Sequence, residues 1–220
     1  VKINMRDCVN ITDNSIECLS ERCRAVETLI LRGCDKITDK CFDFMTYVHP
    51  VEGLHPFTEN LKCLDISFCG GITAQGVTSM LKHGTGIEEL NLSGIPTVND
   101  DIILEICKLC PTIIRLYLSR CTFLSDMALC HMADYLWLDE LDISYCHKIT
   151  DDSIEVLTAS CTGILNLNLR RVTKLTANSL AAIARNCHMI RHLDVKDCPK
   201  VDDMSITDLY HHQKFVKIIR

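Results

Sequence analysis

Residues 136–161 read LWLDELDISYCHKITDDSIEVLTASC, and this stretch decides the fold. Leu141 and Ile143 alternate with polar residues, which is the period of two found in a half-buried strand. From Ile154 onward the apolar residues recur at spacings of three and four, which is the period of a helix. Cys146 lies between the two parts. The stretch therefore predicts a short strand, a turn and a helix.

The same pattern recurs along the whole chain. Successive units lie 26 residues apart, except for one step of 35 and one of 25. We number the repeats by the residue that corresponds to Cys146, and we call this position the Cys slot. In repeats one to eight the Cys slot holds Cys8, Cys34, Cys69, Ile95, Cys121, Cys146, Val172 and Cys198.

A period of roughly 20–29 residues with leucines at this spacing is the signature of a leucine-rich repeat. The sequence therefore predicts an α/β leucine-rich-repeat solenoid of about eight repeats, a horseshoe with a parallel inner sheet and outer helices. We expect strands to start near residues 3, 29, 64, 90, 116, 141, 167 and 193. Residues 1–220 are expected to form one repeat domain. Because neither end has a polar capping repeat, we expect this domain to belong to a longer chain.

The start of each helix is marked by a residue that suits the helix N-cap. The fourth residue after each Cys slot has a side-chain oxygen that can accept a hydrogen bond from an amide of the first turn. An acidic residue follows it in six of the eight repeats, which is favourable beside the helix dipole. The predicted N-caps are Thr12, Thr38, Thr73, Asn99, Ser125, Thr150, Thr176 and Asp202.

Composition and charge exclude some classes of partner. The net charge is −6, and no basic stretch stands out, which argues against nucleic acid as a partner. The most apolar window, residues 102–118, is interrupted by charges and is too short to span a membrane. Ten of the fifteen cysteines recur at two phases of the repeat, as small buried residues would. Reduced thiols predict a cytoplasmic protein, with the nucleus or a cilium as alternatives.

The 35-residue step contains an insertion, PVEGLHPFTEN, at residues 50–60. Its prolines and glycine predict a loop at the edge between helix and strand. One interpretation is a tolerated surface insertion. The other is a contact loop for a partner, with Leu54 and Phe57 as its apolar tips.

The sequence contains no motif that predicts a catalytic site or a cofactor site. Cys107 and Cys110 form a lone C-x-x-C without the second ligand pair that a zinc site needs, so we expect no metal and no cofactor. No Ser–His–Asp or paired-carboxylate motif is evident, so we do not expect an enzyme. The basic residues at the two ends of the sheet lie roughly 24 Å apart, too far to hold one small anion. Cys63 is predicted to be an accessible thiol.

The strand residues that point away from the helices should form the binding surface. Arg115 and Tyr117 are the preferred contacts, because Arg and Tyr are enriched at interface hot spots. The acidic centre of this face favours a partner that presents Lys or Arg. Phe68 and Tyr145 are expected at the rim. The predicted concave contacts are Arg32, Asp65, Glu89, Asn91, Arg115, Tyr117, Glu140, Asp142, Asn168, Arg170, His192 and Asp194.

The Cys slot, the I-T-D turn and the pair Cys110-Pro111 resemble the cysteine-containing leucine-rich repeats of F-box/leucine-rich-repeat proteins. The resemblance covers nearly the whole chain. It implies a protein partner on the concave face and substrate recognition for a cullin-type (SCF) ubiquitin ligase. A Skp-type adaptor would bind through an N-terminal region that precedes these repeats. The alternative is a structural scaffold subunit of a larger assembly, such as a ciliary axonemal dynein regulatory complex.

Overall fold

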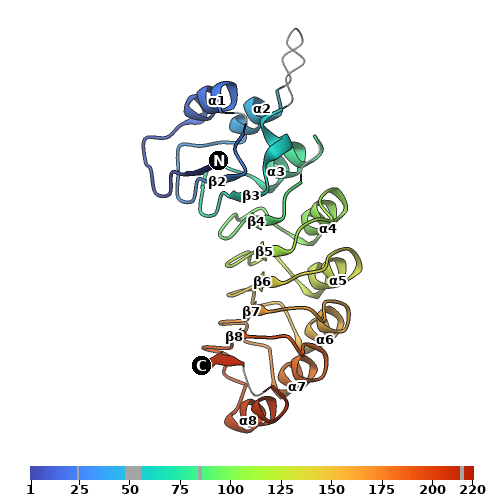
Figure 1. Ribbon diagram of the computed structural model, residues 1–220. Coiled ribbons are helices and arrows are strands. Elements are labelled where there is room, and N and C mark those ends of the chain that lie inside the picture. The colour runs from blue at the N-terminus through green and yellow to red at the C-terminus, as the bar shows by residue number, and fades with distance from the viewer. Residues whose placement is uncertain (24, 48–55, 84–85, 214–215) are drawn as a thin grey trace.

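The computed structural model describes residues 1–220 apart from 24, 48–55, 84–85 and 214–215. Within the described residues, nine strands form one parallel sheet in chain order. The strands line one side of a curved array and the helices line the other (Figure 1). The predicted leucine-rich-repeat solenoid is confirmed. The strands are β1 (Lys2–Asn4), β2 (Thr28–Ile30), β3 (Cys63–Asp65), β4 (Glu89–Asn91), β5 (Arg115–Tyr117), β6 (Glu140–Asp142), β7 (Asn166–Asn168), β8 (His192–Asp194) and β9 (Lys217–Ile219).

Each of the first eight strands begins one residue before its predicted start. The alternation of the strand residues matches the prediction: from β2 to β8 the central leucine is buried and its two neighbours are more exposed. The inward side chains pack against the helices, as Leu141 and Ile143 show with 2% and 0% of their surface exposed. The α-helices are α1 (Asp13–Arg22), α2 (Lys40–Thr46), α3 (Ala74–Leu81), α4 (Asp100–Leu109), α5 (Asp126–Tyr135), α6 (Asp151–Ser160), α7 (Ala177–Asn186) and α8 (Asp203–His212).

In five repeats the thiol in the Cys slot has a structural role. Cys34 Sγ donates a hydrogen bond to the Met5 carbonyl at 3.1 Å, and Cys69 Sγ donates to the Leu31 carbonyl at 3.1 Å. The same bond joins Cys121, Cys146 and Cys198 to the repeat before each. Burial raises the pKa of Cys69 to about 11, which keeps the thiol protonated. The slot therefore links one repeat to the one before it.

In five repeats the acidic residue that follows the predicted N-cap links that repeat to the next. Asp126 accepts two hydrogen bonds from Thr150, from the amide and from the hydroxyl, each at 2.7 Å. Asp13, Asp39, Asp100 and Asp151 accept the same pair of bonds from the following repeat. The predicted N-cap positions are confirmed except at α2, where Asp39 takes the place of Thr38. Thr150 occupies the N-cap position of α6 but makes no side-chain cap bond, and its hydroxyl donates to Asp126. The I-T-D turn thus connects repeats as well as starting helices.

The residue just before each Cys slot adopts the left-handed conformation. Only repeats two and four have glycine there, Gly33 and Gly94, with φ of 69° and 74°. A side chain at Gly94 would clash, because its Cβ would lie 2.5 Å from the ring of Phe68. In the other six repeats a larger residue accepts the strain that L-residues experience at positive φ: Asp7, Phe68, Arg120, Tyr145, Arg171 and Asp197.

Two expectations at the irregular parts of the chain are wrong. Phe57 is not an exposed tip, because it begins a 3-10 helix (Phe57–Asn60) and only 1% of its surface is exposed. Leu54, the other predicted tip, lies outside the described residues. In the sequence, Val216 and Ile219 restart the leucine spacing in a ninth unit, and this spacing would place Ile219 on the inward side. In the structure Ile219 pairs with Asp194 and is 40% exposed on the concave side. Ile218 takes the inward position instead, opposite Leu193.

In the part of the chain that the structure describes, no helix has the length and apolar character needed to cross a membrane.

Candidate functional site

The predicted concave residues lie in rows across the sheet. The parallel register places Arg115 opposite Glu140 and Tyr117 opposite Asp142. All twelve of these side chains are half-buried except His192, which is exposed. They occupy one surface, but they do not converge on one point, because Arg32 follows β2 while His192 begins β8. The arrangement suits an extended partner better than a small ligand.

Two of the predicted contacts are held by neighbouring strands. Arg115 Nε donates a hydrogen bond to Glu89 Oε2 at 3.0 Å, which is also an ion pair. The Tyr117 hydroxyl donates to Glu140 Oε2 at 2.9 Å. Partial burial raises the pKa of Tyr117, and the bond to the Glu140 carboxylate raises it further. Tyr117 therefore keeps its proton, and its ring and the Arg115 guanidinium have fixed positions on the open face.

We call the residues four positions before each Cys slot the middle column of the concave face. In six repeats the side chain of this column accepts a hydrogen bond from the backbone. Asp142 Oδ1 accepts a hydrogen bond from the Ser144 amide at 2.8 Å, and Asn168 Oδ1 accepts one from the Arg170 amide at 3.1 Å. The same bond to the amide two residues later forms at Asn4, Asp65, Asn91 and Asp194. This bond makes the turn that ends the strand, a local role that Asp and Asn commonly have. The restriction of this column to Asp and Asn in six repeats was the signal for that role.

A hollow of about 240 Å³ lies on the concave face over β5 to β8. Tyr117, Glu140 and His192 border it, and Ile219 lies at one end. The ring of His192 is held by a 2.8 Å contact between Nδ1 and Oδ1 of Asn166. Asn166 and Ile219 were not among the predicted contacts. Asn166 lies at the same strand position as the predicted Glu140, and Ile219 was missed because of the register error.

Cys63 is a poor candidate for a reactive thiol. It lies on β3 at a half-buried position beside Glu89. Burial, and then the Glu89 carboxylate, raise the pKa of Cys63 to about 12. Because the thiolate is the nucleophile, this side chain is unreactive near neutral pH.

Aromatic and basic side chains stack along the rim where the strands end. The guanidinium of Arg32 lies 4.7 Å from the ring centre of Phe68. Tyr145 lies between Arg120 and Arg171, at 4.4 and 5.4 Å. Both predicted rim residues, Phe68 and Tyr145, therefore stack against arginines, and their role in binding a partner stays a prediction.

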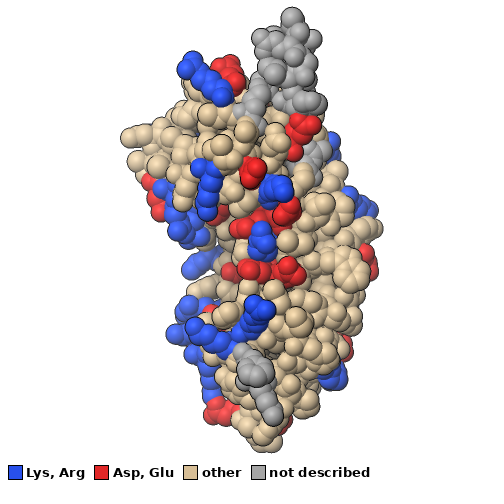
Figure 2. Space-filling view, in the orientation of Figure 1, with Lys and Arg blue, Asp and Glu red and all other residues tan. Residues whose placement is uncertain are grey.

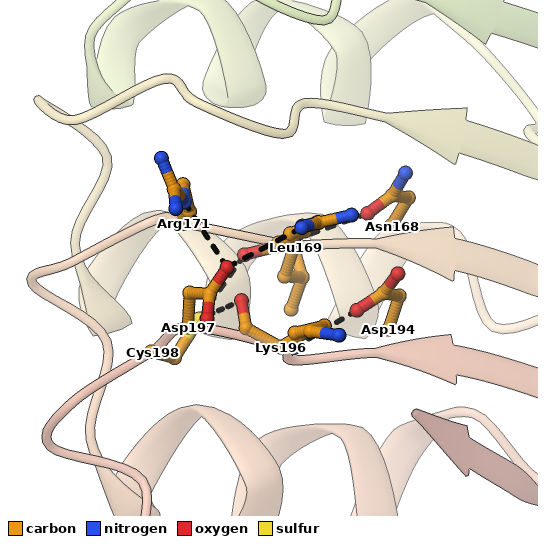
Figure 3. Close-up of polar contacts among 8 residues, drawn as sticks. Asn168, Leu169, Arg171, Asp194, Lys196, Asp197 and Cys198 are labelled. Atoms are coloured by element: carbon orange, nitrogen blue, oxygen red, sulfur yellow. Dashed lines mark hydrogen bonds and ion pairs between the residues drawn. The ribbon is translucent and has the colours of Figure 1, made fainter. Parts of the chain in front are cut away.

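Asp197 binds two arginines on the same rim. Its Oδ2 lies 3.0 Å from Nε of Arg171 and 3.4 Å from Nη2 of Arg170. Figure 3 shows the contact between Asp197 and Arg171, which lies in the turn after β7, close to Asn168 and Asp194 at the ends of their strands. The Arg171 side chain holds the pKa of Asp197 below its usual value.

Within the described residues, no group of three or more His, Cys, Asp or Glu side chains is placed so that it could bind a metal ion. Cys107 and Cys110 are both fully buried at the end of α4.

Comparisons with known proteins agree with this architecture. A family model described as "Leucine Rich repeat" matches residues 59–81 and 136–157. DNA repair protein rhp7 of Schizosaccharomyces pombe is 26% identical over 92% of this chain and 35% of its own length. F-box/LRR-repeat protein 4 of Bos taurus is 24% identical over 87% of this chain and 33% of its own length. The chain thus spans about a third of these curated relatives.

Solved structures show the same fold. The leucine-rich-repeat protein LegL7 of Legionella pneumophila matches with a TM-score of 0.59 at 15% identity, over 98% of this chain and 71% of that one. A chain from the yeast Rad7 and Elc1 complex matches with a TM-score of 0.54 at 14% identity, over 99% and 75%. This chain has the leucine-rich-repeat fold, and its sequence is similar to that of an F-box/LRR-repeat protein and of rhp7.

Proposed function

We propose that this leucine-rich-repeat protein binds another protein across its concave sheet, with Arg115 and Tyr117 as the central contacts. The observation that carries the proposal is the fixed position of these two side chains on the open face. Glu89 and Glu140 orient them, yet neither side chain belongs to the core or to the backbone turns. Ordered Arg and Tyr side chains lose little entropy on binding and are enriched at interface hot spots.

The cellular role that we infer is substrate recognition for a cullin-type ubiquitin ligase. A relative named as an F-box/LRR-repeat protein supports this role. A Skp-type adaptor would then bind a region of the protein outside these residues.

A structural scaffold is the second candidate. Large apolar side chains are also exposed outside the concave strand positions, such as Trp137 at 77% and Met204 at 75%. A scaffold subunit uses several surfaces at once, and exposed apolar side chains commonly mark them.

Affinity capture from cells of the source organism tests the binding face. The bait is the 220-residue chain, and the variant pair is Arg115→Ala with Tyr117→Ala. We expect the captured partner to fall at least tenfold, because hot-spot truncations typically cost more than about 1.4 kcal/mol. The matched control is Arg185→Ala with Tyr210→Ala, which removes an Arg and a Tyr from the helices α7 and α8. Equal loss in both pairs would refute the concave site.

Purification of the full-length protein tests the cellular role. Recovery of a Skp-type adaptor and a cullin supports substrate recognition. Recovery of stoichiometric structural partners without them supports the scaffold.

A further inference from the structure

The loops that follow strands β5 to β8 gather positive charge at one edge of the sheet. Residues 119–124, 144–149, 170–175 and 196–201 contain seven Lys or Arg and one acidic residue, Asp197. The corresponding loops of repeats one to four (6–11, 32–37, 67–72 and 93–98) contain three basic and two acidic residues. We call the first group the basic edge: Arg120, Lys148, Arg170, Arg171, Lys174, Lys196 and Lys200.

The fold brings these residues together although they are spread over 81 positions of the sequence. Lys148, Lys174 and Lys200 each lie two residues after a Cys slot, so consecutive repeats place them in one exposed column. Lys174 Nζ lies 3.4 Å from the carbonyl of Lys148. Figure 2 shows the Lys and Arg side chains gathered at the lower left of the molecule, where these loops lie.

Aromatic rings lie between the cations of this edge. Tyr145 is flanked by Arg120 and Arg171, and Lys148 Nζ lies 5.3 Å from the ring centre of Phe123. Phe123 is 57% exposed. The exposed Phe123 beside Lys148 and the half-buried Tyr145 between two arginines offer apolar contact together with charge, which is typical of a protein-binding surface.

Most basic residues of the basic edge have no carboxylate within ion-pair distance in the described part of the chain, although Lys174 is near enough to Asp126 to lower its pKa. Asp197 pairs with Arg170 and Arg171. Among the described residues, no carboxylate pairs with the other five: Arg120, Lys148, Lys174, Lys196 and Lys200. An unpaired cluster of like charges destabilises the folded chain slightly, and a ligand of opposite charge would remove that repulsion.

We propose that the basic edge binds an acidic segment of the same protein partner that the concave sheet holds. This inference rests on the proposed function and adds the chemistry of the partner. Glu140, Asp142 and Asp194 lie on β6 and β8, directly before the basic edge in the same repeats. We call these three carboxylates the acidic floor. A polypeptide that carries both signs of charge can place its basic side chains on the acidic floor and its acidic side chains on the basic edge. A nucleic acid would meet repulsion from that floor and from a chain of net charge −6.

Binding of short peptides tests the proposal without knowledge of the natural partner. The probes are a fluorescent Glu-rich peptide that contains one Phe and a Gln-rich peptide of equal length, measured by anisotropy at fixed ionic strength. The variant pair is Lys148→Glu with Lys174→Glu. The matched control is Arg6→Glu with Lys36→Glu, which reverses two charges on the same edge in repeats one and two.

We expect the Glu-rich peptide to bind more tightly than the Gln-rich peptide. We also expect the Lys148/Lys174 pair to weaken it about tenfold, since each reversal replaces an attraction by a repulsion. The control pair should change the affinity less than about twofold. Equal weakening by both pairs, or equal binding of the two peptides, would overturn the proposal.

Two further probes separate the other polyanions. If single-stranded oligo(dT) or phosphatidylserine vesicles bind more tightly than the Glu-rich peptide at the same salt, the edge is a nucleic-acid or membrane surface and the proposal is wrong. The Arg115→Ala with Tyr117→Ala protein should still bind the Glu-rich peptide. If the concave-site proposal is wrong, the Glu-rich peptide should still bind to the basic edge. If the basic-edge proposal is wrong, the Glu-rich peptide should show no preferential binding.

Discussion

The two sides of the sheet differ in how they vary from repeat to repeat. The inward side presents nearly the same residues in each repeat, such as the buried central leucines of β2 to β8 and the apolar Cys slot. The outward side carries Thr28, Cys63, Glu89, Arg115, Glu140, Asn166 and His192 at one and the same strand position. Each inner side chain meets another repeat of the same shape, so its identity is constrained. The outer side chains at this position contact one another only in pairs, such as Arg115 with Glu89 and His192 with Asn166. They are not confined by a repeated core, so their differences are available for recognition.

The middle column of the concave face combines features of both sides, because it faces outward but its residue types are constrained. It faces outward, yet six repeats keep Asp or Asn because the side chain accepts the amide two residues later. Tyr117 departs from that rule and makes a bond to Glu140 instead. Because Tyr117 is not needed for the turn, it stays available for a partner, and we keep it as a predicted contact.

The largest expected effect is on the inner side. Leu141→Ala should lower the free energy of unfolding by about 2–5 kcal/mol, because it leaves a cavity between repeats. Urea denaturation followed by circular dichroism measures the change. Val156→Ala on α6, where 43% of the side chain is exposed, is the control and should cost much less. A neutral Leu141→Ala protein would contradict the assigned register.

The connection between repeats at the helix starts should contribute less. Asp126→Ala removes the acceptor of two bonds from Thr150, and we expect a loss of about 1–3 kcal/mol in the same denaturation experiment. Asp152→Ala in the first turn of α6 removes an exposed carboxylate of the same type. If both variants lose the same stability, the dipole rather than the inter-repeat bonds explains the acidic residue.

Acidification should weaken the same connection. Partial burial opposes ionisation of Asp126 and Asp151, but hydrogen bonds from the next repeat outweigh it and lower both pKa values below 3.8. Folding therefore favours the ionised carboxylates, and this stability is present above the unfolded pKa and disappears as the pH falls through the folded pKa. Between about pH 5 and pH 2, wild-type protein should lose more stability than Asp126→Asn with Asp151→Asn. Parallel pH profiles would refute this account.

The smallest effect on stability is expected on the outer face. Arg115→Ala with Tyr117→Ala should change the free energy of unfolding by less than about 1 kcal/mol, since both side chains are half-exposed and form isolated surface contacts. Thermal melting measures this, and the same protein should lose its partner. A large drop in melting temperature would mean that these side chains support the fold.

The sequence by itself determined the repeat, the strand alternation and nearly every helix start. These features depend on contacts that recur with a fixed period, so they are visible in one dimension. The register of β9 was not visible, because Val216 and Ile219 fit the leucine spacing while the paired strands place Ile218 inward. Phe57 read as a loop residue because its burial depends on packing outside the repeat.

Only the tertiary structure decided where charge gathers. No basic stretch is present in the chain, and Arg120, Lys148 and Lys200 are far apart in sequence. Stacking of parallel strands about 4.8 Å apart places residues from successive repeats side by side. A surface built one residue per repeat therefore exists only after the repeats have stacked.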